Sequence, residues 1–348
     1  MKLFRLTSIA VGLSLLAGVV PTASSQSGYH LSKTYKFGAA PGGKEYFDYI
    51  TVDAPNRRVY LSHGSEVLVV NADTGAVIGK ISGLQRDHGI ALVNDLGRGF
   101  ISDGDARKVV VFDLKTLKTI GSVKAAEDAD CIVYDPASKR IFTLNGDAAT
   151  ATAIDPKGQK LIGAVELGGK PEFAAADGNG TLYANLEDKN EVVAIDTQAL
   201  KVKSRWPVAP AGSPVSMAMD RAHRRLFIGT RDPKMLVVMD ADTGKVVQTL
   251  PISAGADATV YDPESGNVFV STREGKIHIF HADSPDLLSP VETVNTEVGA
   301  KTMGYDSKTH NLMADTADFG PAPAPTAEKP HPNGTAVPGT LRLLVYSR

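Results

Sequence analysis

The sequence predicts an all-β protein, a seven-bladed β-propeller whose blades are four-stranded antiparallel sheets. Three observations predict this fold: a segment of about 42 residues recurs seven times, each copy alternates strand-like runs with turn sequences, and each end of the chain holds an incomplete copy. Repeats of about 40–45 residues are typical of propeller blades. Because such a unit cannot shield its own sides from water, seven copies are expected to stand in a ring.

Two series of polar residues, each closing a strand-like run, set the period. The first series advances in steps of 40 to 44 residues and contains Asp53, Asp95, Asp135, Asp177, Asp220, Asp262 and Asp306. The second advances in steps of 41 to 44 residues and contains Asn71, Asp113, Asp155, Asp196, Asp240 and His281. Since two independent markers keep the same spacing, each copy is predicted to form one blade.

Within a copy, the first two strands are joined by a turn that often contains Asp-Pro. "VYDPASKRIF" (residues 133–142) and "VYDPESGNVF" (residues 260–269) share this pattern, with β-favouring residues on both sides. Pro136 and Pro263 fix φ at a value suited to a type I turn. A third run such as "EVLVVN" or "KVVVFD" is apolar at consecutive positions, as expected where neighbouring sheets cover both faces. "ADTG" or "DLKT" then leads into a fourth, outer strand.

The two ends of the chain predict how the ring closes. The last copy supplies "KTMGYD", "NLMADT" and "TLRLLVYS", and the chain stops without a fourth strand. An unassigned strand-like stretch, "YHLSKTYKFG" (residues 29–38), precedes the first copy. We therefore expect this N-terminal strand to complete the last blade, because closure removes the unpaired edge of an open sheet.

Residues 1–25 are predicted to be a cleavable signal peptide. Lys2 and Arg5 precede an apolar run over residues 6–20, and Ala23 and Ser25 stand before a cut at Gln26. This predicts a periplasmic or secreted protein, with residues 26–348 as one propeller domain. The alternative is an uncleaved anchor, but the apolar run is short for a membrane span, so no span is expected after cleavage.

Composition excludes some partners. Removing Lys2 and Arg5 changes the formal net charge from −2 to −4, and a mildly acidic surface does not attract nucleic acid. One Trp and 6% aromatic residues argue against a base-stacking platform. Cys131, the lone cysteine, cannot form an intramolecular disulfide or a haem c attachment, which needs two cysteines; we expect it to be a buried apolar side chain. We expect a monomer.

A Pro/Ala-rich insertion, residues 320–339, interrupts the last copy between its second and third strands. Repeated prolines cannot enter a sheet interior, so an extended surface loop is predicted. The insertion is either simply tolerated or functional, since long loops in compact domains often carry function.

The second strands of the copies include "VYLSHG", "IFTLNG", "LYANLED", "LFIGTRD" and "VFVSTRE". They resemble the YVTN motif of the YVTN/YncE-like seven-bladed propeller family, and the resemblance covers about residues 29–348. It implies an exported bacterial propeller, usually a binding or scaffold protein without an assigned reaction. The repeat is also similar to the propellers of nitrous oxide reductase and haem d1 nitrite reductase, which carry their chemistry on metal or haem.

Charged residues recur five positions before the first-series markers, where the innermost strands begin. The residues at these positions are Asp48, Asp130, Glu172, Val215, Asp257 and Lys301, with His88 nearby in the second copy. We expect them to surround one mouth of the central channel, where variable loops on a repeated frame often hold a site. The predicted ligand-binding residues are Asp48, His88, Asp130, Glu172 and Asp257. Their carboxylates could hold a cation such as calcium or form a solvated polar rim.

A more local metal site is also a candidate. His63 in "SHGSE" and His88 in "RDHGI" come from adjacent copies, near Asp48 and Asp105. Two imidazoles with carboxylate suit zinc, iron or copper. The alternative is that both are ordinary surface histidines, because Gly64 and Gly89, residues typical of turns, follow them.

The sequence therefore predicts a non-catalytic binding or scaffold protein with a protein or small-molecule ligand on the loop face. No G-x-S-x-G, P-loop or H-E-x-x-H motif is present. The alternative is a metal-dependent, lactonase-like hydrolase whose channel-mouth carboxylates hold a cation that activates water. Seven copies argue against direct membership of the six-bladed lactonase propellers of the regucalcin type.

Overall fold

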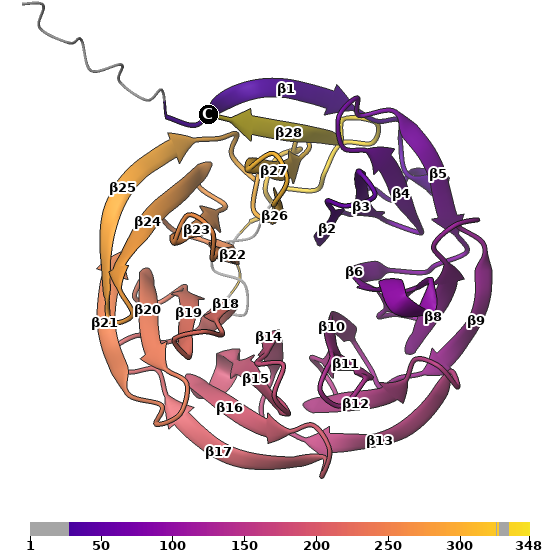
Figure 1. The fold of residues 1–348 in the computed structure, drawn as a ribbon. Coiled ribbons are helices and arrows are strands. Elements are labelled where there is room, and N and C mark those ends of the chain that lie inside the picture. Colours follow the sequence, from indigo (N-terminus) through magenta and orange to yellow (C-terminus); the bar gives the residue numbers. More distant parts are fainter. Residues whose placement is uncertain (1–27, 325, 327–333) are drawn as a thin grey trace, which may run out of the picture.

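Seven four-stranded antiparallel sheets form a closed ring around a central channel (Figure 1). The computed structural model describes residues 28–324, 326 and 334–348. In six of the sheets, strands that follow one another in sequence are neighbours, so each of these blades is a meander that runs from the centre of the ring outwards. The predicted all-β, seven-bladed fold is confirmed.

The strands fall at regular intervals along the chain. From the centre outwards, blade 1 contains β2 (Ile50–Asp53), β3 (Arg58–His63), β4 (Glu66–Asn71) and β5 (Val77–Ser82). Blade 2 contains β6 (Asp87–Val93), β7 (Arg98–Asp103), β8 (Lys108–Asp113) and β9 (Thr119–Lys124). Blade 3 contains β10 (Ala129–Asp135), β11 (Arg140–Asn145), β12 (Thr150–Asp155) and β13 (Lys160–Glu166). Blade 4 contains β14 (Pro171–Ala176), β15 (Thr181–Leu186), β16 (Glu191–Asp196) and β17 (Lys201–Pro207). Blade 5 contains β18 (Pro214–Asp220), β19 (Arg225–Thr230), β20 (Met235–Asp240) and β21 (Val246–Pro251). Blade 6 contains β22 (Ala256–Asp262), β23 (Asn267–Thr272), β24 (Lys276–Ser284) and β25 (Leu287–Asn295). Three short 3₁₀ turns complete the described elements: η1 (Pro41–Gly43), η2 (Asn94–Leu96) and η3 (Glu187–Lys189).

The last blade closes the ring with both ends of the chain. Its strands are β26 (Met303–Asp306), β27 (Asn311–Thr316), β28 (Arg342–Ser347) and, outermost, the N-terminal β1 (His30–Lys36). β1 pairs antiparallel with β28, with Thr34 opposite Leu344 (Figure 1). The predicted closure is confirmed.

The recurring aspartates of the first series have a structural role in the turns. Asp135 accepts hydrogen bonds from the backbone N–H of Ala137 (3.2 Å) and of Ser138 (3.0 Å). Asp262 does the same for Glu264 and Ser265, both at 3.2 Å. These bonds satisfy backbone donors that the reversal leaves unpaired. The repeat therefore encodes turns rather than activity.

The core lies between blades. In one cluster, Cys131 and Phe142 of blade 3 pack with Leu182 and Ile195 of blade 4, and all four side chains are buried. Cys131 is thus a buried apolar side chain, as expected. The outermost strand of blade 1, β5, contributes little to the core because most of its residues are exposed. Inter-blade packing, rather than any one sheet, therefore excludes water and holds the inner strands in place.

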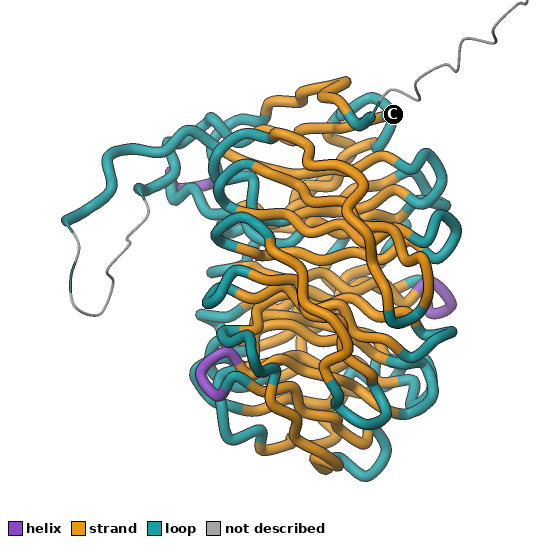
Figure 2. Tube along the Cα trace, turned by 90° about the vertical axis from the view of Figure 1, so that its left-hand side faces the viewer, coloured by secondary structure: helices purple, strands orange, loops and turns teal. Residues whose placement is uncertain are grey.

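The Pro/Ala-rich insertion at 320–339 lies between β27 and β28 in the chain, and its described parts project from one face of the ring (Figure 2). At its base, Phe319 pairs with Ala336 in an isolated antiparallel bridge. Residues 325 and 327–333 of this predicted loop lie outside the described residues.

The predicted signal peptide, residues 1–25, also lies outside the described residues. Within the part of the chain that the structure describes, no helix has the length and apolar character needed to cross a membrane.

Candidate functional site

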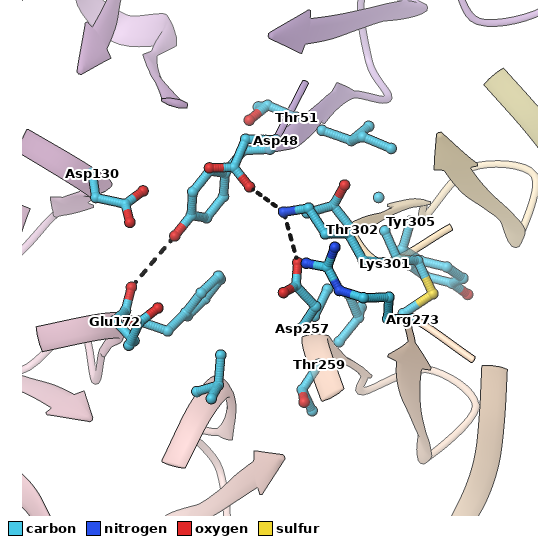
Figure 3. Close-up of a pocket in the computed structure, with 18 of the residues that line it drawn as sticks. Asp48, Thr51, Asp130, Glu172, Asp257, Thr259, Arg273, Lys301, Thr302 and Tyr305 are labelled. Atoms are coloured by element: carbon cyan, nitrogen blue, oxygen red, sulfur yellow. Dashed lines mark hydrogen bonds and ion pairs between the residues drawn. The ribbon is translucent and has the colours of Figure 1, made fainter. Parts of the chain in front are cut away.

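The starts of the innermost strands enclose a cavity of about 460 Å³, called the mouth cavity below (Figure 3). The residues predicted at the channel mouth all line it: Asp48, Asp130, Glu172, Val215, Asp257 and Lys301. His88, in β6, lies behind this surface and contacts two of its members. The ring geometry explains this convergence, because equivalent positions of successive blades come to one end of the channel.

A chain of ion pairs crosses one side of the mouth cavity. Lys301 Nζ lies 2.7 Å from Asp48 Oδ1 and 3.2 Å from Asp257 Oδ2. Asp257 Oδ1 in turn lies 3.3 Å from Arg231 Nη2, and Arg231 Nη1 lies 3.0 Å from Glu187 Oε1. Burial opposes the charge on Lys301, but the neighbouring carboxylates of Asp257 and Asp48 outweigh it and raise its pKa above the ordinary value. The mouth is therefore a mixed-charge surface, not an acidic ring.

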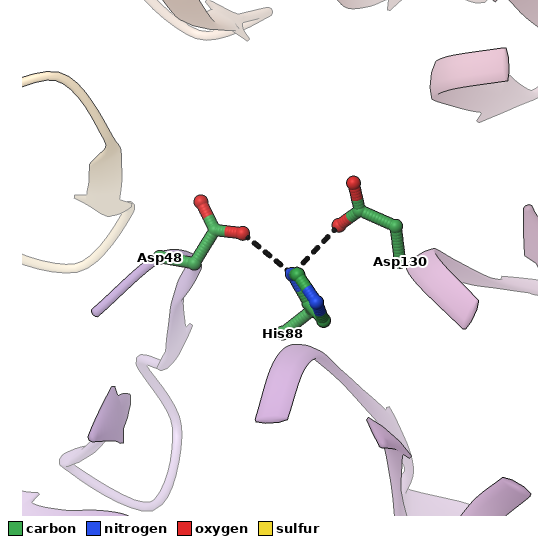
Figure 4. Close-up of side chains that lie close together, drawn as sticks. All are labelled: Asp48, His88 and Asp130. Carbon is green, nitrogen blue, oxygen red and sulfur yellow. Dashed lines mark hydrogen bonds and ion pairs between the residues drawn. The ribbon is translucent and has the colours of Figure 1, made fainter. Parts of the chain in front are cut away.

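On the other side, His88 lies between two carboxylates (Figure 4). Its Nδ1 is 2.8 Å from Asp48 Oδ2 and 3.2 Å from Asp130 Oδ1. The Tyr46 hydroxyl donates to Asp48 Oδ2 at 3.0 Å and lies 3.0 Å from the same Nδ1. Burial lowers the pKa of His88, but Asp130 and Asp48 together raise it to about 10. At neutral pH the imidazole carries a proton between the two carboxylates.

Glu172 has a different electrostatic environment. Burial and the nearby Glu187 raise its pKa to about 9. The positive charge of Arg231 lowers this pKa but does not offset these effects. At neutral pH Glu172 therefore favours its protonated form, with the Glu187 carboxylate as hydrogen-bond partner. Beside it, the rings of Tyr49 and Phe173 stack with centroids 5.7 Å apart and add an apolar surface.

Replacing Glu172 by Gln is expected to remove a pH-dependent loss of stability. An unfolded glutamate ionises above about pH 4.5, whereas folded Glu172 keeps its proton until about pH 9. The wild type therefore loses stability as pH rises through this window, at most by about 1.4 kcal/mol per pH unit. Urea unfolding should show similar stability of wild type and Glu172→Gln near pH 4.5 and a more stable variant at pH 8. The control Glu166→Gln, at an exposed position, should show no such difference from wild type. A Glu172→Gln variant that is no more stable than wild type at pH 8 would contradict the raised pKa of Glu172.

The structure separates the residues predicted as a local metal set. His63 Nε2 lies 2.6 Å from Glu45 Oε1, and the Asp105 side chain is exposed near Arg86. Within the described residues, the one group of three potential ligands whose atoms lie within 4.8 Å of one another is Asp48, His88 and Asp130. The alternative of two surface histidines is wrong, because both side chains are buried: His63 lies at the end of β3 and His88 lies in β6.

Sequence reasoning missed two arginines that line the mouth cavity, Arg231 and Arg273. A signal for them was present: both follow the second strand of their copies, in "GTRD" and "STRE", and they are 42 residues apart. Arg231 belongs to the ion-pair chain. Within the described residues, the Arg273 guanidinium has no ion pair or side-chain hydrogen bond. It also lines an adjoining cavity of about 310 Å³ beneath the Phe319–Ala336 base of the insertion.

Comparisons with known proteins support the fold class alone. No model of a known protein family matches the chain, and no curated protein matches its sequence. Among solved structures, the chain is similar to one in "Crystal Structure of Mitotic Checkpoint Complex", with a TM-score of 0.72, 12% identity and 99% of each chain covered. It is also similar to Kuenenia stuttgartiensis hydrazine synthase, with a TM-score of 0.68, 16% identity and coverage of 78% of this chain and 92% of that one. Fold and topology together define a seven-bladed β-propeller.

Proposed function

We propose that this protein is an exported, non-catalytic binding protein of the YVTN/YncE-like propeller type, and that its mouth cavity holds a small ligand with an anionic group. The observation that carries the proposal is Arg273, a guanidinium that faces a cavity of about 460 Å³ without an ion-pair partner among the described residues. Guanidinium binds carboxylate or phosphate in a two-pronged geometry.

The remaining charges of the mouth cavity favour recognition over catalysis. Asp48 and Asp257 are each held by Lys301, and Asp257 also pairs with Arg231. Side chains fixed in this way are already oriented before a ligand arrives, which reduces the entropy lost on binding. On the opposite wall, the raised pKa of Glu172 reduces the negative charge that an anion would meet, and Tyr49 with Phe173 offers apolar contact. The ligand class that fits is a small carboxylate or phosphate ester with an apolar body.

The binding proposal is tested with paired ligands. We would screen small carboxylates and phosphate esters, each beside its neutral amide or alcohol, by thermal shift and then calorimetry. Acids should bind in preference to their neutral counterparts, and Arg273→Gln should weaken their binding at least about tenfold, since a charge-assisted hydrogen bond contributes about 1.5–3 kcal/mol. Arg221→Gln, on a turn outside this cavity, serves as the matched control. Acids that bind Arg273→Gln as tightly as wild type would contradict the proposal.

Metal-dependent hydrolysis is the second candidate, because Asp48, His88 and Asp130 bring three potential ligands together. A screen of lactones and phosphoesters, with and without chelator, separates the two functions. Turnover that stops on chelation would replace the binding function, and metal-independent ligand binding without turnover supports it. Export is supported by the signal-like residues 1–25 and is tested by cell fractionation of the wild type and a Lys2→Glu/Arg5→Glu variant, which should remain in the cytoplasm.

A further inference from the structure

Three oxygen atoms converge on a single ring nitrogen behind the mouth cavity. Asp48 Oδ2, the Tyr46 hydroxyl and Asp130 Oδ1 lie 2.8, 3.0 and 3.2 Å from His88 Nδ1. A ring nitrogen carries at most one proton, so it cannot give each of these oxygens a hydrogen bond. Asp130 Oδ1 is shielded from solvent and has no hydrogen bond of acceptable geometry, although it lies only 3.2 Å from His88 Nδ1. A metal cation at this point could bind several of these atoms at once, whereas a single proton cannot.

The geometry points to a divalent transition-metal site formed by Asp48 Oδ2, His88 Nδ1 and Asp130 Oδ1. This inference does not depend on the anionic ligand proposed above. It differs from the metal set predicted from sequence, because Asp130 takes the place of His63 and Asp105. One imidazole with two carboxylates is a donor set for zinc, manganese or iron rather than for calcium, which prefers oxygen ligands alone.

The two distances from His88 Nδ1 fit such an ion after a small outward shift, and all three ligand atoms lie within 4.8 Å of one another. Zinc holds nitrogen and oxygen ligands at about 2.0–2.2 Å, which in tetrahedral geometry places neighbouring ligand atoms about 3.3–3.6 Å apart. The distances from His88 Nδ1 to Asp48 Oδ2 and Asp130 Oδ1 are 2.8 and 3.2 Å. Binding therefore needs movements of a few tenths of an ångström and the release of the proton on Nδ1.

Neighbouring groups support the site and leave it accessible. Lys301 contacts the other oxygen of Asp48, Oδ1, and so leaves Oδ2 directed toward His88. Tyr46 donates to Asp48 Oδ2 and fixes its orientation, as groups around metal ligands commonly do. Asp48 and Asp130 also line the mouth cavity, so a bound ion has an open position that water or a ligand reaches from the channel.

The test uses the purified full chain, stripped of metal with a chelator, dialysed, and titrated with Zn²⁺ by calorimetry and with Co²⁺ by visible absorption. We expect one ion per chain and a d–d band of Co²⁺ bound to nitrogen and oxygen. The isosteric Asp130→Asn and the His88→Gln variants should bind at least tenfold more weakly. His63→Gln is the matched control: its imidazole is equally buried but pairs with Glu45, so binding should be unchanged.

Each outcome decides the inference. Stoichiometric binding that falls in Asp130→Asn and survives in His63→Gln supports it. A wild-type chain that takes up no Zn²⁺ or Co²⁺ overturns it, even if the variants fail to fold. Equal affinity of wild type and Asp130→Asn also overturns it, because the ion would then lie elsewhere. Loss of carboxylate binding in Arg273→Gln reports on the proposed function and leaves this result unaffected.

Discussion

A chain that lacks residues 29–36 should unfold at a much lower temperature than the full chain. The deletion removes β1, which pairs with β28 along the outer edge of the last blade, and it removes Tyr29. Tyr29 is buried, meets Phe269 edge to face at 5.9 Å, and donates its hydroxyl proton to His310 O at 2.8 Å. Truncating a buried aromatic side chain alone costs about 3–5 kcal/mol. With the lost strand pairing, we expect a loss of roughly 5 kcal/mol or more, about 10 °C in Tm.

Thermal unfolding followed by circular dichroism measures this effect. A variant that lacks only residues 1–27 keeps β1 and is the matched control, with an expected Tm equal to that of the full chain. Tyr29→Ala should give an intermediate loss, because β1 can still pair with β28. An unchanged melting temperature after removal of β1 would show that the ring does not depend on closure by the two ends.

Lys301→Met should produce the second-largest loss, about 3 kcal/mol in the free energy of unfolding. The Lys301 side chain is only 16% exposed. It bridges Asp48, which precedes the first strand of blade 1, and Asp257 in the first strand of blade 6. Methionine fills a similar volume, so the change removes the charge with little loss of packing. Breaking a buried ion pair from one side costs about 3–5 kcal/mol. We expect the lower end of this range because His88 still contacts Asp48 and Arg231 still pairs with Asp257.

Urea unfolding at pH 7 compares this variant with Lys201→Met, a lysine-to-methionine change on the exposed outer strand β17. The control should change stability by less than about 0.5 kcal/mol. Adding Asp257→Asn to Lys301→Met should restore part of the loss, because it removes a carboxylate that has lost one of its two cationic partners. Similar effects of Lys301→Met and Lys201→Met would refute the view that the ion-pair chain holds the mouth together.

Much of the fold could be predicted because its signals are local and repeated. Each of the turns at Asp135 and Asp262 precedes the third strand of its own copy by about 15 residues, and the same pattern recurs in other copies. The ring also follows, since equivalent positions of equivalent blades must lie at equal distances from its axis. For that reason the residues predicted at the channel mouth, from Asp48 to Lys301, line one cavity.

The partners within the site could not be predicted in the same way. The sequence places His63 with His88 because they come from adjacent copies, but the His63 ring contacts Glu45, and Asp130 of the next blade contacts His88 instead. Lys301 pairs with Asp48 although 253 residues separate them. Such pairings depend on the directions of individual side chains at the centre of the ring, which the period does not specify.

The sequence by itself determined the number of blades, their four-strand plan, the turns and the closure of the last blade by the first strand, because each depends on hydrogen bonding and burial encoded within one repeat. Only the tertiary structure decided which charges neutralise each other, that burial beside Glu187 raises the pKa of Glu172, and that Arg273 has no partner among the described residues. Electrostatic interactions depend on distance and burial in space rather than on position along the chain.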